Sequence, residues 1–541
     1  MPDLELSHFA RAADDIGRYG DNDTLPFDID TRFIKENAAT LAKMAFAYSQ
    51  QLDGISAKDA RKAIGSLRVF SERLLTPTGS AGFRITTKVH PFWAIYFNGL
   101  GIAIGSVLEP RRSERVHSYR LTASGEDLFD RASSWRAFRE ATIRECEGLG
   151  ESGIIVQTDI SSFYEHVSHH RVENLVHDLF PAGSTIATQV DRFLSRFASG
   201  RSFGLPVGGQ CSRILAELLL SAVDRRLSDE RVKWRRYVDD FVLFTSGQAD
   251  AYRALSILAH SLADYGLTLN RTKTTLLTEK HYVDYVRTQL GIGDAEVGKL
   301  VEIDLHFDPY SETADSDYEE LREVVEGLNV RALLNLQLHK AQPDTFLVAQ
   351  IGRTLRLHEP RVSLELCETL LSRANLHAFR ASWSTIMRGV AAVRGDDTFA
   401  AIFEGLDLLL DAIPEHSPHL LRAESSVLHY LRTIRYRRTE RRAECVSAVY
   451  GGTASETVIR SCIDCWRLWK DRPAFTRERN RWESLSAEQQ RMLWLAASQF
   501  GDEGQKFRQQ TRGTLEVSWS LGIERPPTTT FATLYADWAS A

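Results

Sequence analysis

Residues 234–244 constrain the fold of this 541-residue chain most strongly, because two adjacent aspartates interrupt an apolar stretch. Trp234 to Val238 and Phe241 to Phe244 read as strands, which predicts a β-hairpin with Asp239 and Asp240 at its tip. Surface hairpins usually turn on Asp-Gly or Asn-Gly, and adjacent carboxylates repel each other unless a cation neutralises them. Side chains alternate along a strand, so we expect the two aspartates to face different ways.

A second segment also places an aspartate at the end of an apolar strand pattern. Residues 153–158 form an apolar strand pattern that delivers Asp159 to the edge of a sheet. Carboxylate oxygens are hard ligands that suit Mg²⁺. Two such ions about 3.5–4 Å apart can activate a 3′-hydroxyl and stabilise leaving pyrophosphate. We therefore expect Asp159 and Asp239, with Asp240 secondary, to hold two Mg²⁺ ions, for which Mn²⁺ can substitute, and to transfer nucleotides from dNTPs.

The residues after Asp159 allow two interpretations. Tyr164 can stack under a deoxyribose and exclude a 2′-hydroxyl, with Phe163 beside it at the nucleotide. Alternatively, both rings anchor a helix over residues 162–179 to the sheet.

Two further segments are also ambiguous. Gly208, Gly209 and Ser212 lie in a glycine-rich turn before an apolar helix at 214–227, where backbone can approach a nucleotide or template closely. The same glycines also suit a simple turn. Lys273 can protonate the leaving pyrophosphate as a general acid, or it can be an ordinary exposed turn lysine.

Bulk composition sets broad limits. The net charge of −6 argues against a purely electrostatic nucleic-acid binder, although a local basic cleft is compatible with it. Six scattered cysteines indicate a reducing cytoplasm rather than a disulfide framework. We expect neither a signal peptide nor a membrane-spanning segment, and therefore no membrane partner.

The chain divides into four stretches by pattern. Residues 1–75 have helical spacing, and 80–145 read as short apolar segments broken by Gly and Pro. Strand and helix alternate to about 305. After residues 308–311, Ser316 and Glu319 have capping-box spacing for a new helix. An apolar stripe over 399–413 is typical of the helices that follow. Irregular helical hairpins there resemble HEAT repeats.

The order of these segments resembles motifs A to D of reverse transcriptases. The matching residues are Asp159 with its aromatic pair; Pro206, Gly208 and Ser212; the run Tyr237-Val238-Asp239-Asp240; and Gly266 to Lys273. The resemblance implies that the three aspartates are catalytic and that Tyr164 gates the sugar. It implies that Gly208, Gly209 and Ser212 support nucleotide or template, and that Arg84 and Lys88 hold the triphosphate. Val207 and Arg213 depart from the usual Gln and Pro.

The implied fold class is α+β. It comprises an N-terminal helical segment over 1–75 that is part of the fingers, then fingers and palm over 76–305. The palm would carry a ferredoxin-like antiparallel sheet. An all-α HEAT-like domain would cover 306–541.

The segment Val116-His117-Ser118-Tyr119-Arg120 and the run Asp-Ile-Ser-Ser-Phe-Tyr resemble one subgroup, the prokaryotic abortive-infection enzymes. These are the AbiK type and the P2-prophage Abi type within the "unknown group" of defence-associated reverse transcriptases. Membership would imply antiphage defence in the bacterial cytoplasm and homo-oligomers. It would also imply DNA synthesis without a template, primed from a protein hydroxyl, so that the single-stranded product becomes attached to protein.

Basic runs in the C-terminal part predict a channel for that product, or else solvated helix faces. The candidates for product binding are Arg435, Arg437, Arg438, Arg441 and Arg442. The candidates for priming are Tyr430, Tyr436 and Tyr450. Cys462 and Cys465 have metal-like spacing without a second pair, so we expect a buried helix turn there.

Three other functions compete with untemplated synthesis. A conventional templated reverse transcriptase needs the same carboxylates. A nucleotide cyclase would carry Gly-Gly-Asp/Glu-Glu-Phe at the hairpin, which this chain lacks. A silent palm that only binds nucleic acid or a phage protein would keep three clustered carboxylates without a compensating cation, which is unfavourable.

Overall fold

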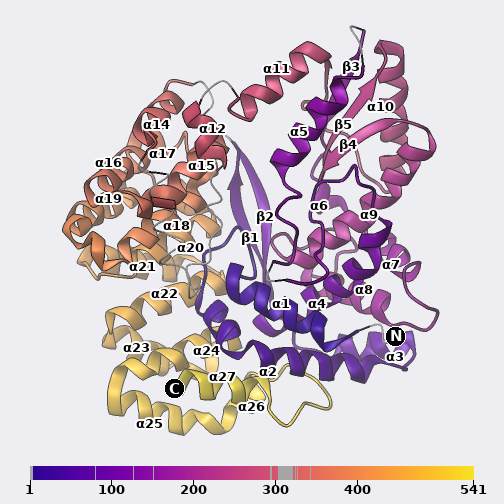
Figure 1. Cartoon of the computed structure of the whole chain (residues 1–541). Helices are drawn as coiled ribbons and strands as arrows, with labels where there is room; N and C mark the ends of the chain where they lie inside the picture. The colour runs from indigo at the N-terminus through magenta and orange to yellow at the C-terminus, as the bar shows by residue number, and fades with distance from the viewer. Residues whose placement is uncertain are drawn as a thin grey trace.

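The computed structural model describes residues 4–79, 81–125, 127–149, 152–292, 295–302, 321–322, 325, 327–340 and 343–540. Within these residues the chain forms two small antiparallel sheets and a large helical region, the mixed α+β class (Figure 1). The predicted boundary at 305/306, residues 308–311 and the cap at Ser316 and Glu319 lie outside the described residues.

The larger sheet contains four strands in the order β4-β5-β3-β6. The strands are β3 (Ile154–Thr158), β4 (Lys233–Tyr237), β5 (Asp240–Thr245) and β6 (Thr275–Thr278). Helix α9 (Gln210–Asp229) precedes β4, and α10 (Gln248–Ala263) precedes β6. All pairs are antiparallel, which gives the βαββαβ ferredoxin-like order. The predicted hairpin and first strand are confirmed.

The two central strands, β3 and β5, are buried on both faces, which explains their apolar sequences. Ile155 and Val242 pack under α5 (Trp135–Cys146) and α11 (Glu279–Gln289). Their neighbours Val156 and Leu243 point to the opposite face and join the main core.

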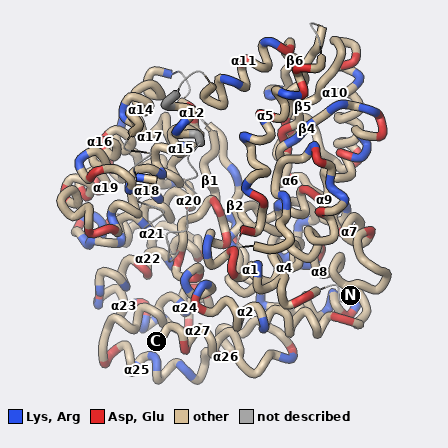
Figure 2. Tube along the Cα trace, viewed as in Figure 1, with Lys and Arg blue, Asp and Glu red and all other residues tan. Residues whose placement is uncertain are grey.

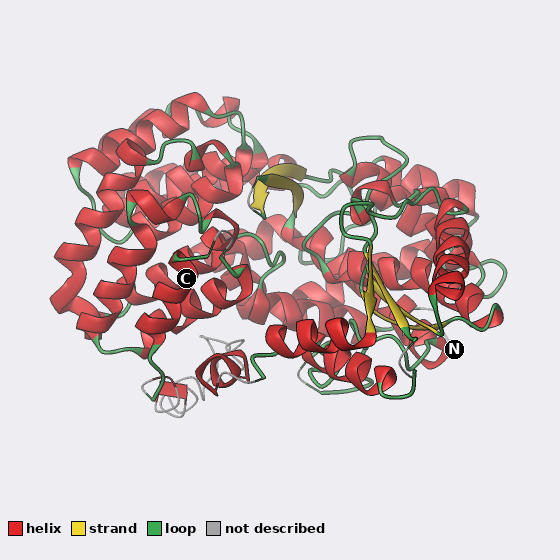
Figure 3. Cartoon of the chain, turned by 90° about the horizontal axis from the view of Figure 1, so that it is seen from above, coloured by secondary structure: helices red, strands yellow, loops and turns green. Residues whose placement is uncertain are grey.

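The smaller sheet is a hairpin of β1 (Ser71–Thr78) and β2 (Gly82–Val89). It stands between the palm and the C-terminal helices (Figure 3). The predicted boundary at 75/76 falls inside β1. Three N-terminal helices precede the hairpin: α1 (Leu6–Tyr19), α2 (Ile29–Leu52) and α3 (Ala57–Gly65).

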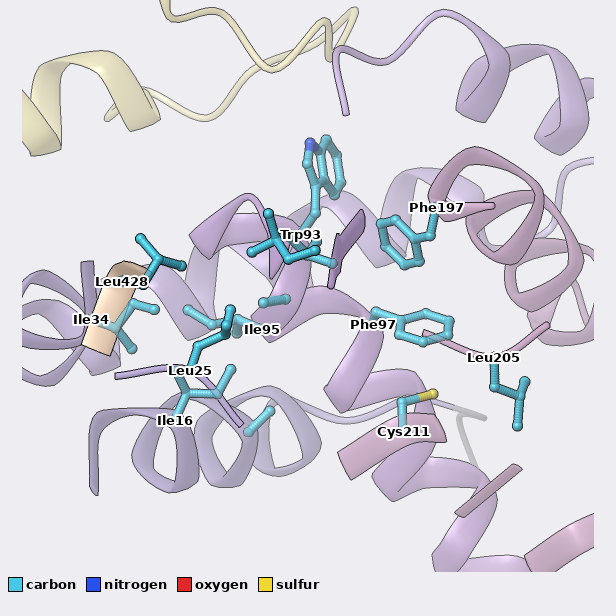
Figure 4. Close-up of a cluster of buried hydrophobic side chains, with 14 of the residues drawn as sticks. Ile16, Leu25, Ile34, Trp93, Ile95, Phe97, Phe197, Leu205, Cys211 and Leu428 are labelled. Atoms are coloured by element: carbon cyan, nitrogen blue, oxygen red, sulfur yellow. The ribbon is translucent and has the colours of Figure 1, made fainter. Parts of the chain in front are cut away.

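The expectation of short broken segments over 80–145 is wrong in one respect, because α4 (Pro91–Leu108) is an 18-residue helix. Its glycines lie where other elements pack closely rather than where the helix breaks. A Cβ on Gly101 would lie 2.6 Å from Cα of Cys211 on α9. By length and composition, Pro91–Arg111 alone in the described part of the chain could cross a membrane, but 89% of its most apolar window is buried. Figure 4 shows this core around Trp93 and Phe97.

The helix predicted over 162–179 is interrupted. Ser162 adopts a left-handed φ of 45° before α6 (Phe163–His166), and Val167 is extended before α7 (His169–His177). Glu165 N donates to Ser162 O, and His169 N pairs with Ser202 O instead of continuing the helix. Helix α8 (Ile186–Phe197) follows, and a 3-10 turn, η1 (Glu109–Arg111), ends α4.

From residue 295 the described chain is entirely helical and curls around the hairpin (Figure 1). Its α-helices are α12 (Ala295–Glu302), α14 (Val330–Leu338), α15 (Thr345–Thr354), α16 (Pro360–Leu371), α17 (Arg373–Leu376), α18 (Trp383–Arg394), α19 (Phe403–His416), α20 (Glu424–Ile434), α21 (Glu440–Gly452), α22 (Glu456–Trp469), α23 (Arg472–Arg479), α24 (Ala487–Ala496), α25 (Gly501–Thr511), α26 (Leu515–Ser518) and α27 (Phe531–Ser540). Seven 3-10 turns connect them: η2 (Leu355–Leu357), η3 (Arg380–Ser382), η4 (Asp397–Ile402), η5 (Leu420–Arg422), η6 (Trp482–Ser484), η7 (Ala497–Phe500) and η8 (Arg512–Thr514). The apolar stripe predicted over residues 399–413 is divided between η4 and α19.

The C-terminal helices are fastened to the N-terminal part through buried polar contacts. The Glu72 carboxylate accepts from the backbone N–H groups that open α22, at Glu456 (3.0 Å) and Thr457 (2.9 Å). Arg460 lies 2.7 Å from Asp30 in a pair that is almost wholly buried. Because removing one member of such a pair strands the other charge, these contacts fix how the two parts sit together.

Candidate active site

Strand β3 delivers Asp159 to a buried position at the edge of the sheet, where it is 6% exposed. The loop between α10 and β6 meets it there. Asn270 Nδ2 donates to Asp159 Oδ2 at 3.2 Å, and the Lys273 ammonium lies 2.8 Å from the same oxygen. Asn270 N also donates to the Asp159 carbonyl at 2.7 Å. This carboxylate is therefore held by one loop that lies more than a hundred residues further along the chain.

Asp239 lies in the turn of the β4–β5 hairpin. Tyr237 pairs with Asp240, so Val238 and Asp239 are the two central residues. Val238 has a left-handed φ of 52°, which is strained for a β-branched side chain. Its N–H donates to Ser118 Oγ at 2.9 Å, and its carbonyl accepts from Arg236 at 3.2 Å. These two bonds hold the strained turn.

A buried charge network lies beneath the turn. Arg236 is fully buried, with both oxygens of Asp224 at 2.8 Å and Glu217 also at 2.8 Å. Ser118 Oγ donates to Glu217 at 2.6 Å, and Arg112 lies 2.8 Å from it. Burial alone would raise the pKa of Glu217, but Arg236 and Arg112 hold it below its ordinary value. This buried network thus holds the β4–β5 hairpin in a fixed position.

The three aspartates form one electrostatic cluster. Burial raises the pKa of Asp239 to about 7, and the charges of Asp159 and Asp240 add to the rise. Burial and Asp159 also raise the pKa of Asp240, while Arg139 opposes that shift. The structure therefore brings together the carboxylates that the sequence singled out.

As these side chains stand, no group of three or more His, Cys, Asp or Glu in the described residues is arranged to hold a metal ion. The Lys273 ammonium supplies the positive charge beside Asp159 instead. The donor set nevertheless fits a hard divalent cation, because carboxylates that raise one another's pKa are stabilised by a shared positive charge.

The aromatic pair has two different environments. Phe163 is 2% exposed and packs in the core, as an anchoring ring does. Tyr164 contacts it at 5.4 Å between ring centroids. Burial, Tyr119 and the charge of Asp239 all raise the pKa of the Tyr164 phenol.

The glycine-rich turn is occupied by another part of the chain. Gly208 has a φ of 117°, and a Cβ there would lie 2.1 Å from Nδ2 of Asn22. That amide donates to the carbonyls of Val207 and Thr87, each at 3.1 Å. Gly209 is the N-cap of α9, and Ser212 is buried with a hydroxyl that has no hydrogen-bond partner among the described residues. Asn22 thus links the glycine-rich turn to β2 through hydrogen bonds.

The structure does not bring the two basic residues assigned to the triphosphate into one site. Arg84 is exposed on β2. Lys88 is 3% exposed, with Asp21 at 2.8 Å and Asp28 at 2.9 Å from its ammonium. Lys88 is therefore engaged in a buried ion-pair network rather than presented at a surface.

The arginine run around α21 serves two purposes. Arg442 is 1% exposed between Asp407 and Asp411, and Arg435 pairs with Asp464 at 2.6 Å. These two are structural. The other three keep exposed guanidinium groups and pair at the surface: Arg437 with Asp407, Arg438 with Asp471 and Arg441 with Glu415. Acidic and basic residues are interspersed over these helices (Figure 2).

The three tyrosines considered for priming differ in access. Tyr430 is 1% exposed and donates to the Leu410 carbonyl at 3.1 Å. Tyr450 donates to Glu478. Tyr436 is 39% exposed. The Cys462 and Cys465 thiols are buried on α22, as expected for a helix turn.

Sequence reasoning gave no site role to Ser118, Tyr119, Asn22 or Arg213. Arg213 lies on α9 with its guanidinium 4.9 Å from the Tyr119 ring centroid. In the sequence, the segment that contains Ser118 and Tyr119 is distinguished only by its resemblance to one subgroup of reverse transcriptases. Its contacts join residues about a hundred positions apart, so no local pattern could have revealed them.

The comparison with known protein families agrees with this geometry. Residues 111–290 match the family described as reverse transcriptase (RNA-dependent DNA polymerase). No curated protein sequence matched significantly. Similar solved structures include telomerase from Candida albicans in complex with a fragment of telomeric RNA (12% identity, 65% of this chain, 68% of that chain, TM-score 0.29). Apo telomerase from Candida tropicalis is another (12% identity, 67% and 69%, TM-score 0.31).

Both TM-scores lie below 0.5, so neither similarity establishes a shared overall fold. The family match spans β3, the β4–β5 turn and Lys273, the same segments that bring the aspartates together. The chain therefore contains a reverse transcriptase domain over residues 111–290 and is a nucleotidyltransferase of that type.

Proposed function

We propose that this chain makes DNA from dNTPs without a template, as an abortive-infection reverse transcriptase in antiphage defence. One observation carries the polymerase assignment: Asp159, Asp239 and Asp240 form a single electrostatic cluster, with Lys273 on Asp159. The defence role rests on the resemblance of residues 116–120 and 159–164 to that subgroup.

Asp159 and Asp239 would hold Mg²⁺, with Asp240 contributing and Mn²⁺ able to substitute. When bound, such ions activate the attacking hydroxyl and stabilise the developing charge on the phosphates. Tyr164 would pack under the sugar of the incoming nucleotide. The attacking hydroxyl loses its proton to solvent and its oxygen forms a bond to the α-phosphorus, while the bond from this phosphorus to pyrophosphate breaks.

Lys273 would give its proton to the departing pyrophosphate. Burial would lower the pKa of Lys273, but its hydrogen bond to Asp159 and the nearby carboxylate charges raise it overall. The amine is thus protonated at neutral pH and can act as an acid.

Synthesis without a template is supported by the contents of the glycine-rich turn. Asn22 fills the space over Gly208, and the Ser212 side chain is buried. A template base therefore has no access to these two positions as they stand. This arrangement favours DNA synthesis without a template over the templated synthesis of a conventional reverse transcriptase.

We place the remaining features of the subgroup as follows. Tyr436 is the preferred priming hydroxyl, because its phenol is exposed whereas burial raises the pKa of the enclosed Tyr430. The single-stranded product would then be attached to protein and contact Arg437, Arg438 and Arg441. The C-terminal helices would form HEAT-like repeats in a homo-oligomer of the bacterial cytoplasm. Six free thiols are compatible with that reducing compartment.

Purified protein incubated with labelled dNTPs and Mg²⁺, with no nucleic acid added, tests this function. We expect labelled polymer that stays with protein under denaturing conditions and disappears in Asp239→Ala and Asp159→Ala. Asp250→Ala, which changes an aspartate on α10 outside the cluster, is the matched control. Polymer unaffected by both cluster variants would reject the site.

The same assay separates the alternatives. Synthesis only when RNA is added would identify a templated reverse transcriptase and reject the subgroup behaviour. Absence of synthesis with and without RNA, together with retained nucleic-acid binding, would identify a silent scaffold. Tyr436→Phe should abolish the protein-attached polymer if this tyrosine is the primer, because phenylalanine has no hydroxyl to attack the first nucleotide.

A further inference from the structure

Arg213 of α9 forms an ion pair with Asp23, which lies in the segment between α1 and α2. The Arg213 guanidinium lies over the Tyr119 ring, 4.9 Å from its centroid, and donates to Gln210 Oε1 at 2.9 Å. The Asp23 side chain is 53% exposed and that of Arg213 is 19% exposed. In this pair the arginine is therefore fixed by its contacts with Tyr119 and Gln210, whereas the carboxylate is exposed to solvent.

Tyr119 connects this pair to the catalytic turn. Its neighbour Ser118 accepts from Val238 N at 2.9 Å, next to Asp239. Tyr119 has a left-handed φ of 46°, and Arg112 fixes it by donating to the Tyr119 carbonyl at 2.8 Å. A strained residue held this way gives the Arg213 guanidinium a defined place relative to the turn.

The loop that carries Asp23 is anchored on both sides. Arg388 of α18 donates to the carbonyls of Asp23 and Leu25, each at 2.6 Å. Asn22 ties the preceding position to Val207. These backbone contacts fix the loop. The Asp23 carboxylate is therefore held in place while only one of its oxygens, Oδ2, bonds to Arg213.

We propose that Arg213 and Asp23 bind the nucleobase of the incoming nucleotide and stand in for a template base. The inference rests on the proposed untemplated synthesis. An unpaired base has both donors and acceptors on its edge, and leaving them unmatched in a closed site is unfavourable. A guanidinium offers several N–H donors and a carboxylate offers acceptors, so together they can match such an edge.

The geometry supplies the parts that base recognition needs. Within the described residues, Gln210 and Asp23 accept from Arg213 N–H groups, which orients the planar fork against Tyr119. In the adjacent glycine turn, the Asn22 side chain fills the space beside Gly208. Lysine at position 213 would keep the charge and lose the fork.

The experiment measures kcat and KM for each of the four dNTPs in turn, without template, in wild type, Arg213→Lys and Asp23→Asn. We expect the relative kcat/KM among the dNTPs to change about tenfold, mainly through KM, because hydrogen bonds to the base are altered. Arg512→Lys and Asp537→Asn, which alter an exposed ion pair in the C-terminal helices, should leave the ratios unchanged.

Unchanged ratios in both site variants would overturn the inference. Asp23→Asn is the decisive variant if Arg213→Lys is poorly folded, because the Asp23 carboxylate is half exposed. Failure of the proposed function is a different result, namely a wild-type protein that incorporates no dNTP without template.

Discussion

The ammonium of Lys273 lies 2.8 Å from Oδ2 of Asp159 and joins the loop before β6 to the end of β3. The two side chains differ sharply in access, since that of Lys273 is 65% exposed and that of Asp159 is 9% exposed. An exposed amine therefore compensates a buried carboxylate. Such an amine can move toward a phosphate without unpacking the core.

Lys273→Met should slow incorporation about 10²-fold, which is the usual range for losing a general acid. Stability should also fall, because the change leaves the buried Asp159 carboxylate without its cation, but by less than the about 3–5 kcal/mol of a fully buried pair, since the Lys273 side chain is exposed. Single-turnover rates and thermal unfolding measure the two effects. Lys280→Met, at an exposed position of α11, is the control. Equal rates in both variants would mean that Lys273 is an ordinary surface residue.

The pH dependence of stability should report the raised pKa of Asp239, which is about 7 because of burial and the charges of Asp159 and Asp240. A carboxyl whose folded pKa is raised favours the folded state at low pH. That contribution is complete below about pH 4 and is lost as pH rises toward 7.

Metal-free Asp239→Asn should consequently be more stable than wild type at pH 8, on the order of 2 kcal/mol, and about equally stable at pH 4. Denaturant unfolding in EDTA at both pH values is the measurement. Adding Mg²⁺ at pH 8 should stabilise wild type more than the variant. A stability difference that does not depend on pH would contradict the assigned cause.

Ser118→Ala should lower activity more than stability. It removes the acceptor for Val238 N and the donor to Glu217, so the turn that carries Asp239 loses its anchor. We expect a loss of about 1–2 kcal/mol in stability and about 10²-fold in rate from misplacement of the carboxylate. Ser261→Ala is a matched buried control on α10, whose hydroxyl bonds only within its own helix. Parallel losses in rate and stability in both variants would argue against a positioning role.

Gly208→Ala should destabilise the protein by more than the strain of a positive φ. Its Cβ would meet the buried Asn22 amide, which would have to give up two hydrogen bonds. Gly200 is the control, because it also has a positive φ but has open space at the Cβ position. Thermal unfolding should show a drop for Gly208→Ala larger by about 1–3 kcal/mol. Equal drops would show that Asn22 does not fill the turn tightly.

Part of the site could be read from the chain. The apolar run at 241–244 after the two aspartates and the strand ending at Thr158 are local signals, because a strand that is buried on both sides must be apolar on both faces. Motif order then placed Asp159 near the hairpin. The helical character of the C-terminal part is likewise a local signal.

Other predictions failed where packing overrode local appearance. The glycines of 91–108 looked like breaks, but they lie where helices touch at Phe9 and Cys211. Lys88 and Arg442 looked like ligand-binding cations, but both are buried among aspartates. Sequence spacing cannot distinguish an arginine that faces water from one that faces a carboxylate on a distant helix.

The amino-acid sequence by itself determined the strands, the hairpin and the carboxylates at their ends, because each depends on residues within one short segment. Tertiary structure alone decided that Asn22 fills the turn at Gly208 and that Arg213 rests on Tyr119 beside Asp23. These contacts join segments roughly a hundred or more residues apart, and their geometry follows from how the whole core packs rather than from any local preference.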